Sequence, residues 1–300
     1  MLQFRQLTLA DRALLADALR GQDYENSELS FANLYMWRKG WDIQIAEEGG
    51  VFYFSYRNPD DKCVGHMQPV VPLGQPVRPA VDTALADLKQ RRCGLDIMGV
   101  NEEFVTRLRQ EDTAGLVIAE DRDLAEYIYL REDLVGLQGK KYHGKRNHIN
   151  RFLAESGDYA WEELTPALLD ECLGIGCQWL QNKEDADATV DESEMLAIRE
   201  AVAHMEELGL TGALLRVGGK PCGFTVGEHF RPGLALIHLE KADPTIPGSY
   251  AFINQQFLQR SFGDVTFVNR EEDMGIPGLR RAKESYYPVR LVAKYRIREA

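Results

Sequence analysis

Apolar and polar residues alternate, or recur with helical spacing, along nearly the whole chain. Residues 42–56, DIQIAEEGGVFYFSY, alternate around a Gly-Gly pair and predict a β-hairpin, and residues 212–230 predict a second hairpin that turns at Gly218 and Gly219. Short apolar runs predict further strands over 67–73, 95–100, 115–120, 126–130, 159–164, 234–240, 264–269 and 289–297. Apolar residues three and four apart predict helices over 10–20, 27–41, 80–90, 101–110, 166–180, 192–208 and 251–262.

The order of these elements repeats in the two halves of the chain. Residues 98–104, MGVNEEF, resemble residues 267–273, FVNREED, because each is a strand end followed by Val-Asn and by acids that open a helix. Such an echo indicates a duplicated α+β topology, in which each half is a mixed sheet flanked by helices. We therefore expect domains over residues 1–130 and 131–300, and a single domain with one mixed sheet is the alternative.

Composition narrows the class of protein. The 300 residues carry a formal net charge of −12, which argues against a DNA-coating protein. Five cysteines without a C-x-x-C pair favour reduced thiols over disulfides, and no metal site is expected. The sequence shows neither a secretory leader nor an apolar run of about 18 residues that could span a membrane. A cytoplasmic protein without an integral membrane segment is expected.

One dense basic run interrupts this acidic chain. Residues 140–152, KKYHGKRNHINRF, predict an amphipathic helix whose buried stripe is Tyr142, Ile149 and Leu153. No acid lies between the first and the last cation to relieve their repulsion, which favours an external anion. A solvated helix face and a brace against the acidic residues 184–194 are the alternatives. The candidate anion-binding residues are Lys140, Lys141, Lys145, Arg146 and Arg151.

A strand-to-helix junction offers a second anion site. In residues 242–254, ADPTIPGSYAFIN, the pair Gly248 and Ser249 stands at the predicted helix start, where free backbone N–H groups point outward. An ordinary capped turn is the alternative. Walker and dinucleotide-binding fingerprints are absent from the sequence.

The densest polar segment of the second half is residues 269–288, NREEDMGIPGLRRAKESYYP. It follows a predicted strand, a position where sheet enzymes place ligand groups. Its acids, together with Glu240 at the end of another strand, could bind an amine or act as a base. A helix with acids in its first turn and cations in its last is the alternative. The candidates from these segments are Glu240, Asn269, Glu272, Arg280, Lys283, Tyr286 and Tyr287.

Residues 127–152 and 267–297 resemble an uncharacterised bacterial family related to the C-terminal domain of phosphatidylglycerol lysyltransferases. The resemblance covers most of the chain. It implies two tandem acyl-CoA N-acyltransferase-like domains, as in the aminoacyl-transferring Fem ligases. It also implies a splayed strand near Leu239–Lys241 and a phosphate-binding turn within Pro244–Tyr250.

Specific roles follow from this resemblance. Gly248, Ser249 and Tyr250 are the implied cofactor-binding residues, and Tyr286 or Tyr287 is the implied acid near the leaving group. Beside this acid, Glu240 or Glu272 would position or deprotonate the acceptor, so Tyr286, Glu240 and Glu272 are the candidate catalytic residues. The turn DPTIPGSY lacks the usual Gly-rich pyrophosphate loop, which disfavours acetyl-CoA as donor. The missing membrane-spanning region of the lysyltransferases disfavours a phospholipid acceptor.

The function expected is transfer of an acyl or aminoacyl group to an amine or hydroxyl. The donor would be acyl-CoA or aminoacyl-tRNA, no further cofactor is required, and the acceptor would be a small molecule or peptide. A non-catalytic sensor that binds a phosphorylated or anionic small ligand in the same cleft is the alternative, because a fold does not fix function.

Overall fold

The computed structural model describes residues 2–57, 63–91, 96–181 and 188–300, with side chains described outside residues 181–191. The chain forms two compact units, each considered by itself. The first contains residues 1–126, 272–275 and 292–300, and the second contains 127–271 and 276–291. The chain first passes from one unit to the other after residue 126, close to the expected boundary at residue 131. The last residues, expected in the second domain, return to the first unit.

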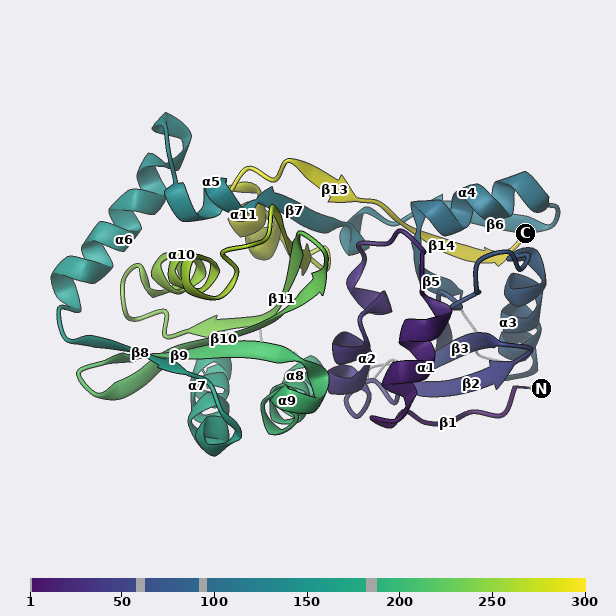
Figure 1. Ribbon diagram of the computed structural model, residues 1–300, viewed down its shortest axis with the longest axis horizontal. Coiled ribbons are helices and arrows are strands. Elements are labelled where there is room, and N and C mark those ends of the chain that lie inside the picture. Colours follow the sequence, from purple (N-terminus) through teal and green to yellow (C-terminus); the bar gives the residue numbers. More distant parts are fainter. Residues whose placement is uncertain (1, 58–62, 92–95, 182–187) are drawn as a thin grey trace. The chain divides into compact units, whose positions relative to one another are not determined.

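In the first unit, the described strands form a seven-stranded mixed sheet in the order β1-β2-β3-β4-β5-β14-β6 (Figure 1). Strands β4 and β5 pair in parallel, whereas β2 and β3 form the expected antiparallel hairpin. The elements are β1 (Arg5–Gln6), α1 (Asp11–Ala18), η1 (Ser27–Leu29), α2 (Phe31–Trp37), β2 (Gln44–Glu48), β3 (Val51–Arg57), β4 (Val64–Met67), α3 (Arg78–Arg91), β5 (Ile97–Asn101), α4 (Glu102–Glu111), β6 (Leu116–Glu120), η2 (Arg122–Leu124) and β14 (Lys294–Glu299).

The second unit is built on another mixed sheet of seven described strands, ordered β13-β7-β12-β11-β10-β9-β8. Figure 1 shows α6 and α10 on one side of β8 to β11 and α7 to α9 on the other. The elements are β7 (Glu126–Leu130), α5 (Arg131–Gly136), η3 (Lys140–Tyr142), α6 (His143–Glu155), β8 (Tyr159–Glu163), η4 (Pro166–Leu168), α7 (Leu169–Gln181), α8 (Ala188–Ala203), α9 (Met205–Leu208), β9 (Leu210–Val217), β10 (Lys220–Arg231), β11 (Leu234–Ala242), α10 (Ser249–Ser261), β12 (Phe267–Glu272), α11 (Pro277–Glu284) and β13 (Arg290–Val292).

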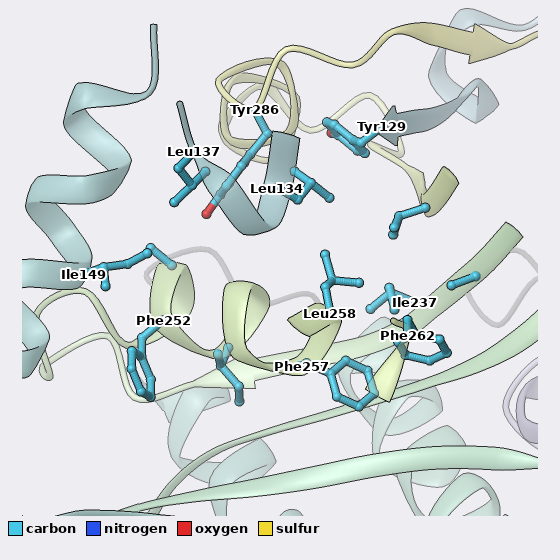
Figure 2. Packing of buried hydrophobic residues seen from close by; sticks show 14 of the residues in the cluster. Tyr129, Leu134, Leu137, Ile149, Ile237, Phe252, Phe257, Leu258, Phe262 and Tyr286 are labelled. Atoms are coloured by element: carbon cyan, nitrogen blue, oxygen red, sulfur yellow. The ribbon is translucent and has the colours of Figure 1, made fainter. Parts of the chain in front are cut away.

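Each unit has an apolar core of its own. In the first, one face of α3 and α4 packs on β3, β5 and β14. In the second, α10 supplies Phe252, Phe257 and Leu258, which pack with Ile149 of α6 and Ile237 of β11 (Figure 2). Two mixed sheets flanked by helices confirm the predicted α+β class.

Residues 289–297 were expected to form a single strand, and this was wrong. The segment divides at position 293, so that β13 joins the second sheet and β14 the first. Lys294 explains the division. Its side chain is fully buried and its Nζ lies 2.6 Å from Glu28 Oε1 and 2.5 Å from Glu126 Oε1, both in the first unit.

The basic run is helical, but its expected buried stripe was partly wrong. Tyr142 and Ile149 are buried, whereas Leu153 is 42% exposed and Phe152 takes the buried position. The run begins with the 3₁₀ turn η3 before α6 starts at His143. A 3₁₀ turn advances about 120° per residue, so the position of Tyr142 does not fix the phase of the α-helix.

The expected helix with acids in its first turn was also wrong for residues 269–288. The acids lie at the end of β12 and in the turn after it, and α11 starts later, at Pro277, without an acid in its first turn. Asn269 Oδ1 accepts a hydrogen bond from the Glu271 N–H, and Glu271 adopts a positive φ of 58°. The local turn uses the residues that the sequence pattern assigned to the helix.

Candidate functional site

Strands β11 and β12 separate within the second sheet. They pair in parallel over three positions, ending at Leu236 opposite Asn269, although β11 continues to Ala242 and β12 to Glu272. On its other side, β11 pairs with β10 in a register that skips His238, which marks a β-bulge. Beyond Leu236, the described part of β11 therefore has no parallel neighbour.

Four side chains from four segments meet where these strands part. Glu240 comes from β11, Arg270 from β12, Lys145 from α6 and Tyr286 from the segment after α11. The Arg270 Nη2 donates to Glu240 Oε1 at 2.9 Å across the gap between the strands. The expected splay near Leu239–Lys241 falls within the same stretch of β11. We call these four residues the splay cluster.

Arg270 is the centre of the splay cluster. Its guanidinium carbon lies 4.9 Å from the Tyr286 ring centroid and 5.8 Å from that of Tyr129. Among the described residues its Nη1 is buried without a hydrogen-bond partner. The same holds for Oγ1 of Thr225, a residue of β10 that lies opposite Glu240 of β11. Buried polar groups normally have partners, so both atoms could serve a bound polar group.

Lys145 is half-buried and lies one helical turn before the buried Ile149 on α6. Its Nζ lies 3.7 Å from the centroid of the Tyr286 ring. Burial and, to a lesser extent, the nearby Arg270 charge lower the pKa of Lys145 to about 8, although the Glu240 carboxylate acts in the opposite direction. Part of the Lys145 population is therefore a neutral amine near physiological pH.

Tyr286 and Glu240 differ in how they are held. The Tyr286 side chain is buried, and Figure 2 shows it beside Leu137 with its hydroxyl directed away from α11. Burial raises the pKa of Tyr286 to about 12. Both oxygens of Glu240 are occupied, one by Arg270 and the other by Asn254 Nδ2 at 3.1 Å. Tyr287, the alternative acid, is 45% exposed.

His238 supports the bulge behind the splay cluster. Its Nδ1 lies 2.9 Å from Glu271 Oε1, and its Nε2 lies 3.1 Å from Glu228 Oε1. Burial alone would lower the pKa of His238, but the hydrogen bonds to Glu228 and Glu271 outweigh it and raise the pKa to about 9. The imidazole is therefore charged near neutral pH, and it links β10, β11 and the end of β12.

The other cations of the basic run have partners outside the splay cluster. Lys141 pairs with Asp133 at 3.3 Å, and Arg151 pairs with Glu155 at 2.7 Å. Arg146 donates to the carbonyl oxygens of Leu137 and Gly139, after the end of α5. Lys140 is exposed. Lys145 is thus the cation of the run that reaches the splay cluster, whereas Lys141, Arg146 and Arg151 bind groups near them in the sequence.

Two lysines of the basic run contact the polar segment 269–288. Lys141 and Lys145 lie over the rings of Tyr287 and Tyr286, within the segment 269–288. The acidic alternative, residues 184–194, lies partly outside the described residues, and Glu194 pairs with Lys241.

The expected phosphate turn is covered by α6. Gly248 has φ of 83°, and a Cβ built there would lie 2.0 Å from the carbonyl oxygen of His148. The Ser249 hydroxyl donates to the Asp243 carbonyl at 3.0 Å. Burial raises the pKa of Tyr250 to about 12. These three residues therefore serve the packing of α10, and their role in binding a cofactor stays a prediction.

The remaining candidates are not among the four side chains of the splay cluster. Glu272 belongs to the first unit, where its Oε2 lies 4.0 Å from Lys294 Nζ. Lys283 donates to the Arg270 carbonyl at 2.5 Å and so fixes the end of β12. Asn269 is buried in the turn described above, and Arg280 lies on α11.

Arg270, Asn254 and Tyr129 were missed from the sequence. Arg270 could have been found, because it lies two residues after the buried Val268 on the same strand, and alternate strand residues share a face. Asn254 looked like an ordinary polar position of a helix. Among the described residues no group of His, Cys, Asp and Glu could hold a metal ion. None of the described helices is long and apolar enough to cross a membrane.

The family described as phosphatidylglycerol lysyltransferase, C-terminal, matches residues 21–298. The chain belongs to this family. An uncharacterised protein of Mycoplasmoides gallisepticum is 24% identical over 173 residues, which are 57% of this chain and 55% of that protein. The match thus spans about half the length of this curated relative.

Solved structures support the family at the level of the fold. A conserved protein of unknown function from Bacteroides thetaiotaomicron is 36% identical over all of both chains, with a TM-score of 0.87. The L-PGS of Bacillus licheniformis is 16% identical over 96% of this lysyltransferase-family chain and 92% of its own, with a TM-score of 0.63. A tandem GNAT protein of the clavulanic acid pathway is 12% identical over 100% of this chain and 98% of its own, with a TM-score of 0.52. The tandem N-acyltransferase-like fold is thereby confirmed.

Proposed function

We propose that this protein transfers an aminoacyl or other acyl group to an amine or hydroxyl, and that the splay cluster of the second unit is the site of transfer. The observation that carries the proposal is the parting of β11 and β12 with Lys145, Glu240, Arg270 and Tyr286 gathered at the gap. The family name adds aminoacyl transfer as the activity of its namesake.

The side of β11 that β12 leaves open after Leu236 suits the acyl group of the donor. Backbone N–H groups that no neighbouring strand occupies can donate to a carbonyl oxygen, and they stabilise it further as negative charge develops on it. Such preorganised donors are commonly worth about 3–4 kcal/mol of transition-state stabilisation. The donor's acyl carbon would therefore lie beside β11, after Leu236.

Charge at the splay cluster favours an anionic substrate group. Lys145 and Arg270 are cationic when protonated, whereas Glu240 supplies a single negative charge that Arg270 and Asn254 already hold. Arg270 Nη1 is free to donate among the described residues. A phosphate or carboxylate on donor or acceptor fits this excess of positive charge.

Tyr286 is the residue to which we assign protonation of the leaving group. Attack by the acceptor forms a bond to the acyl carbon, and the bond from that carbon to the donor oxygen or sulfur breaks. The departing atom takes the electron pair and needs a proton, which the Tyr286 hydroxyl supplies. A phenol whose pKa is about 12 stays protonated at working pH, and it matches a leaving oxygen, which becomes a strongly basic alkoxide, better than a leaving sulfur.

The test is a transfer assay with labelled aminoacyl-tRNAs and acyl-CoAs against amine and hydroxyl acceptors, comparing wild type with Tyr286→Phe. We expect the variant to lose about 10²-fold or more in kcat with an unchanged fold. Tyr159→Phe is the matched control, because Tyr159 lies at 36% exposure on β8. Ligand binding without transfer by the wild type would instead support the sensor alternative.

A further inference from the structure

The acceptor must lose a proton as it attacks, so the transfer proposed above requires a base. Glu240 is the carboxylate of the splay cluster, but its Oε1 accepts from Arg270 at 2.9 Å and its Oε2 accepts from Asn254 at 3.1 Å. Both oxygens are therefore already engaged by donors of the protein, and an acceptor could reach either of them only by displacing Arg270 or Asn254. Glu240 therefore suits the positioning of Arg270.

Lys145 has the opposite surroundings. Unlike Lys141 and Arg151, it has neither an ion pair nor a hydrogen bond to any described residue, and its Nζ lies over the face of Tyr286. A charged ammonium so placed gains the ring contact and the attraction of the Glu240 carboxylate, with which it forms no ion pair. The neutral amine, in contrast, has a lone pair that nothing in the described site occupies.

The charged groups around Lys145 come from several elements. Arg270 of β12 disfavours the ammonium and Glu240 of β11 favours it, with burial as the larger effect. On α5, the Asp133 carboxylate is taken by Lys141, and on α6 itself Arg146 is turned to backbone carbonyls. A pKa of about 8 for Lys145 lies near working pH, where a general base is most effective.

We propose that the Lys145 amine, and not the Glu240 carboxylate, is the base that accepts the proton of the attacking acceptor; this rests on the proposed transfer function. The proton passes from the acceptor nitrogen or oxygen to Nζ as the bond to the acyl carbon forms. Tyr286 protonates the leaving atom, and the Lys145 ammonium and Tyr286 phenolate are then restored through solvent. In sum, one proton moves from acceptor to donor.

Two substitutions separate a base from an anion-binding cation. Lys145→Arg keeps the positive charge but cannot lose its proton at working pH, and Lys145→Met removes both. We expect both variants to lose 10²-fold or more in kcat, with KM changed much less for Lys145→Arg. The exposed Lys220, at the hairpin turn between β9 and β10, provides the matched control Lys220→Met.

The pH profile of the wild type gives an independent readout. We expect kcat/KM to rise with pH and to level off above about pH 8, as the amine becomes neutral. The rising limb should be absent from Lys145→Arg, and small alkylamines added to Lys145→Ala should restore part of its rate.

The outcomes distinguish the two proposals. If the wild type transfers and Lys145→Arg retains its rate and pH profile, the base assignment is overturned while the transfer function stands. If Glu240→Gln abolishes the rising limb and Lys145→Arg does not, the base is Glu240. Absence of transfer by the wild type with every donor and acceptor overturns the transfer function and the base assignment with it.

Discussion

His238 is a buried imidazole held between two carboxylates, and its protonation is coupled to the stability of the second unit. The side chain is fully buried between Glu228 and Glu271. Removal of its proton would leave two buried carboxylates with one fewer donor, which is costly in a low-dielectric interior. The β-bulge of β11 and the end of β12 therefore depend on a charged histidine.

This coupling predicts how stability changes with pH. Because the pKa of His238 is about 9 when folded and ordinarily 6.5, its contribution is complete below about pH 6.5 and is lost as pH rises through 9. The loss is on the order of 3 kcal/mol. Urea unfolding at pH 6, 7.5 and 9 should show it in the wild type, and a flatter dependence in His238→Gln.

His229 provides the matched control for that experiment. It also contacts one carboxylate, that of Asp264 at 2.9 Å, but its side chain is 46% exposed. His229→Gln should keep the wild-type pH dependence. An identical dependence in His238→Gln and the wild type would show that the imidazole is not the group responsible.

At the scale of elements, the second unit depends on how closely α6 approaches the start of α10. The His148 carbonyl oxygen lies where a side chain at Gly248 would begin, and Phe152 and Phe252 stack with ring centroids 4.3 Å apart. Lys145, on the same helix α6, lies over the ring of Tyr286, so a shift of α6 would move Lys145 relative to that ring. Contact between these two helices thus shapes the splay cluster as well as the core.

Gly248→Ala should test this contact. We expect a loss of more than about 3 kcal/mol in unfolding free energy, because the methyl group adds a backbone clash to an unfavourable φ. Gly218→Ala, at a turn with φ of 56° and nothing near the added Cβ, should cost about 1 kcal/mol. Equal losses in chemical denaturation of the two variants would contradict a close approach of α6.

The elements show what local sequence can predict. The hairpins, the strand and helix order, and the buried Tyr142 and Ile149 followed from periodicity, because one face of each element packs on the core. Lys145, Glu240 and Tyr286 were candidates for their residue type and position. Strand periodicity places Arg270 on the same face as Val268, but it could not reveal that Arg270 pairs with Glu240 of another strand, or that β14 leaves β13, because long-range ion pairs decide both.

At the scale of the whole chain, an ion-pair cluster in the first unit contains residues from the places where the chain enters or leaves that unit. Glu126 ends its first segment, Glu272 begins the short return and Lys294 lies just inside the last segment. Lys294 Nζ contacts Glu28 and Glu126, with Glu272 at 4.0 Å. Burial raises the pKa of Glu28 to about 7, against the pull of the ammonium.

Lys294→Met should therefore be severely destabilising. Removing the ammonium leaves buried carboxylates without their shared cation, at a cost of about 3–5 kcal/mol. Thermal and urea unfolding would measure it, with hydrogen exchange in β5 and β6 locating the loss. The control is Lys89→Met, since Lys89 is 73% exposed where it pairs with Glu299. Similar melting temperatures for the two variants would exclude the cluster as an anchor.

The position of β14 has a consequence for synthesis on the ribosome. This strand lies between β5 and β6 in the first sheet, yet it is translated after the whole second unit. Until then, β5 and β6 each present an open edge, and open edges invite pairing with other chains. The first sheet therefore stays incomplete until β14 has been synthesised, and we expect chaperones to bind the amino-terminal half during translation.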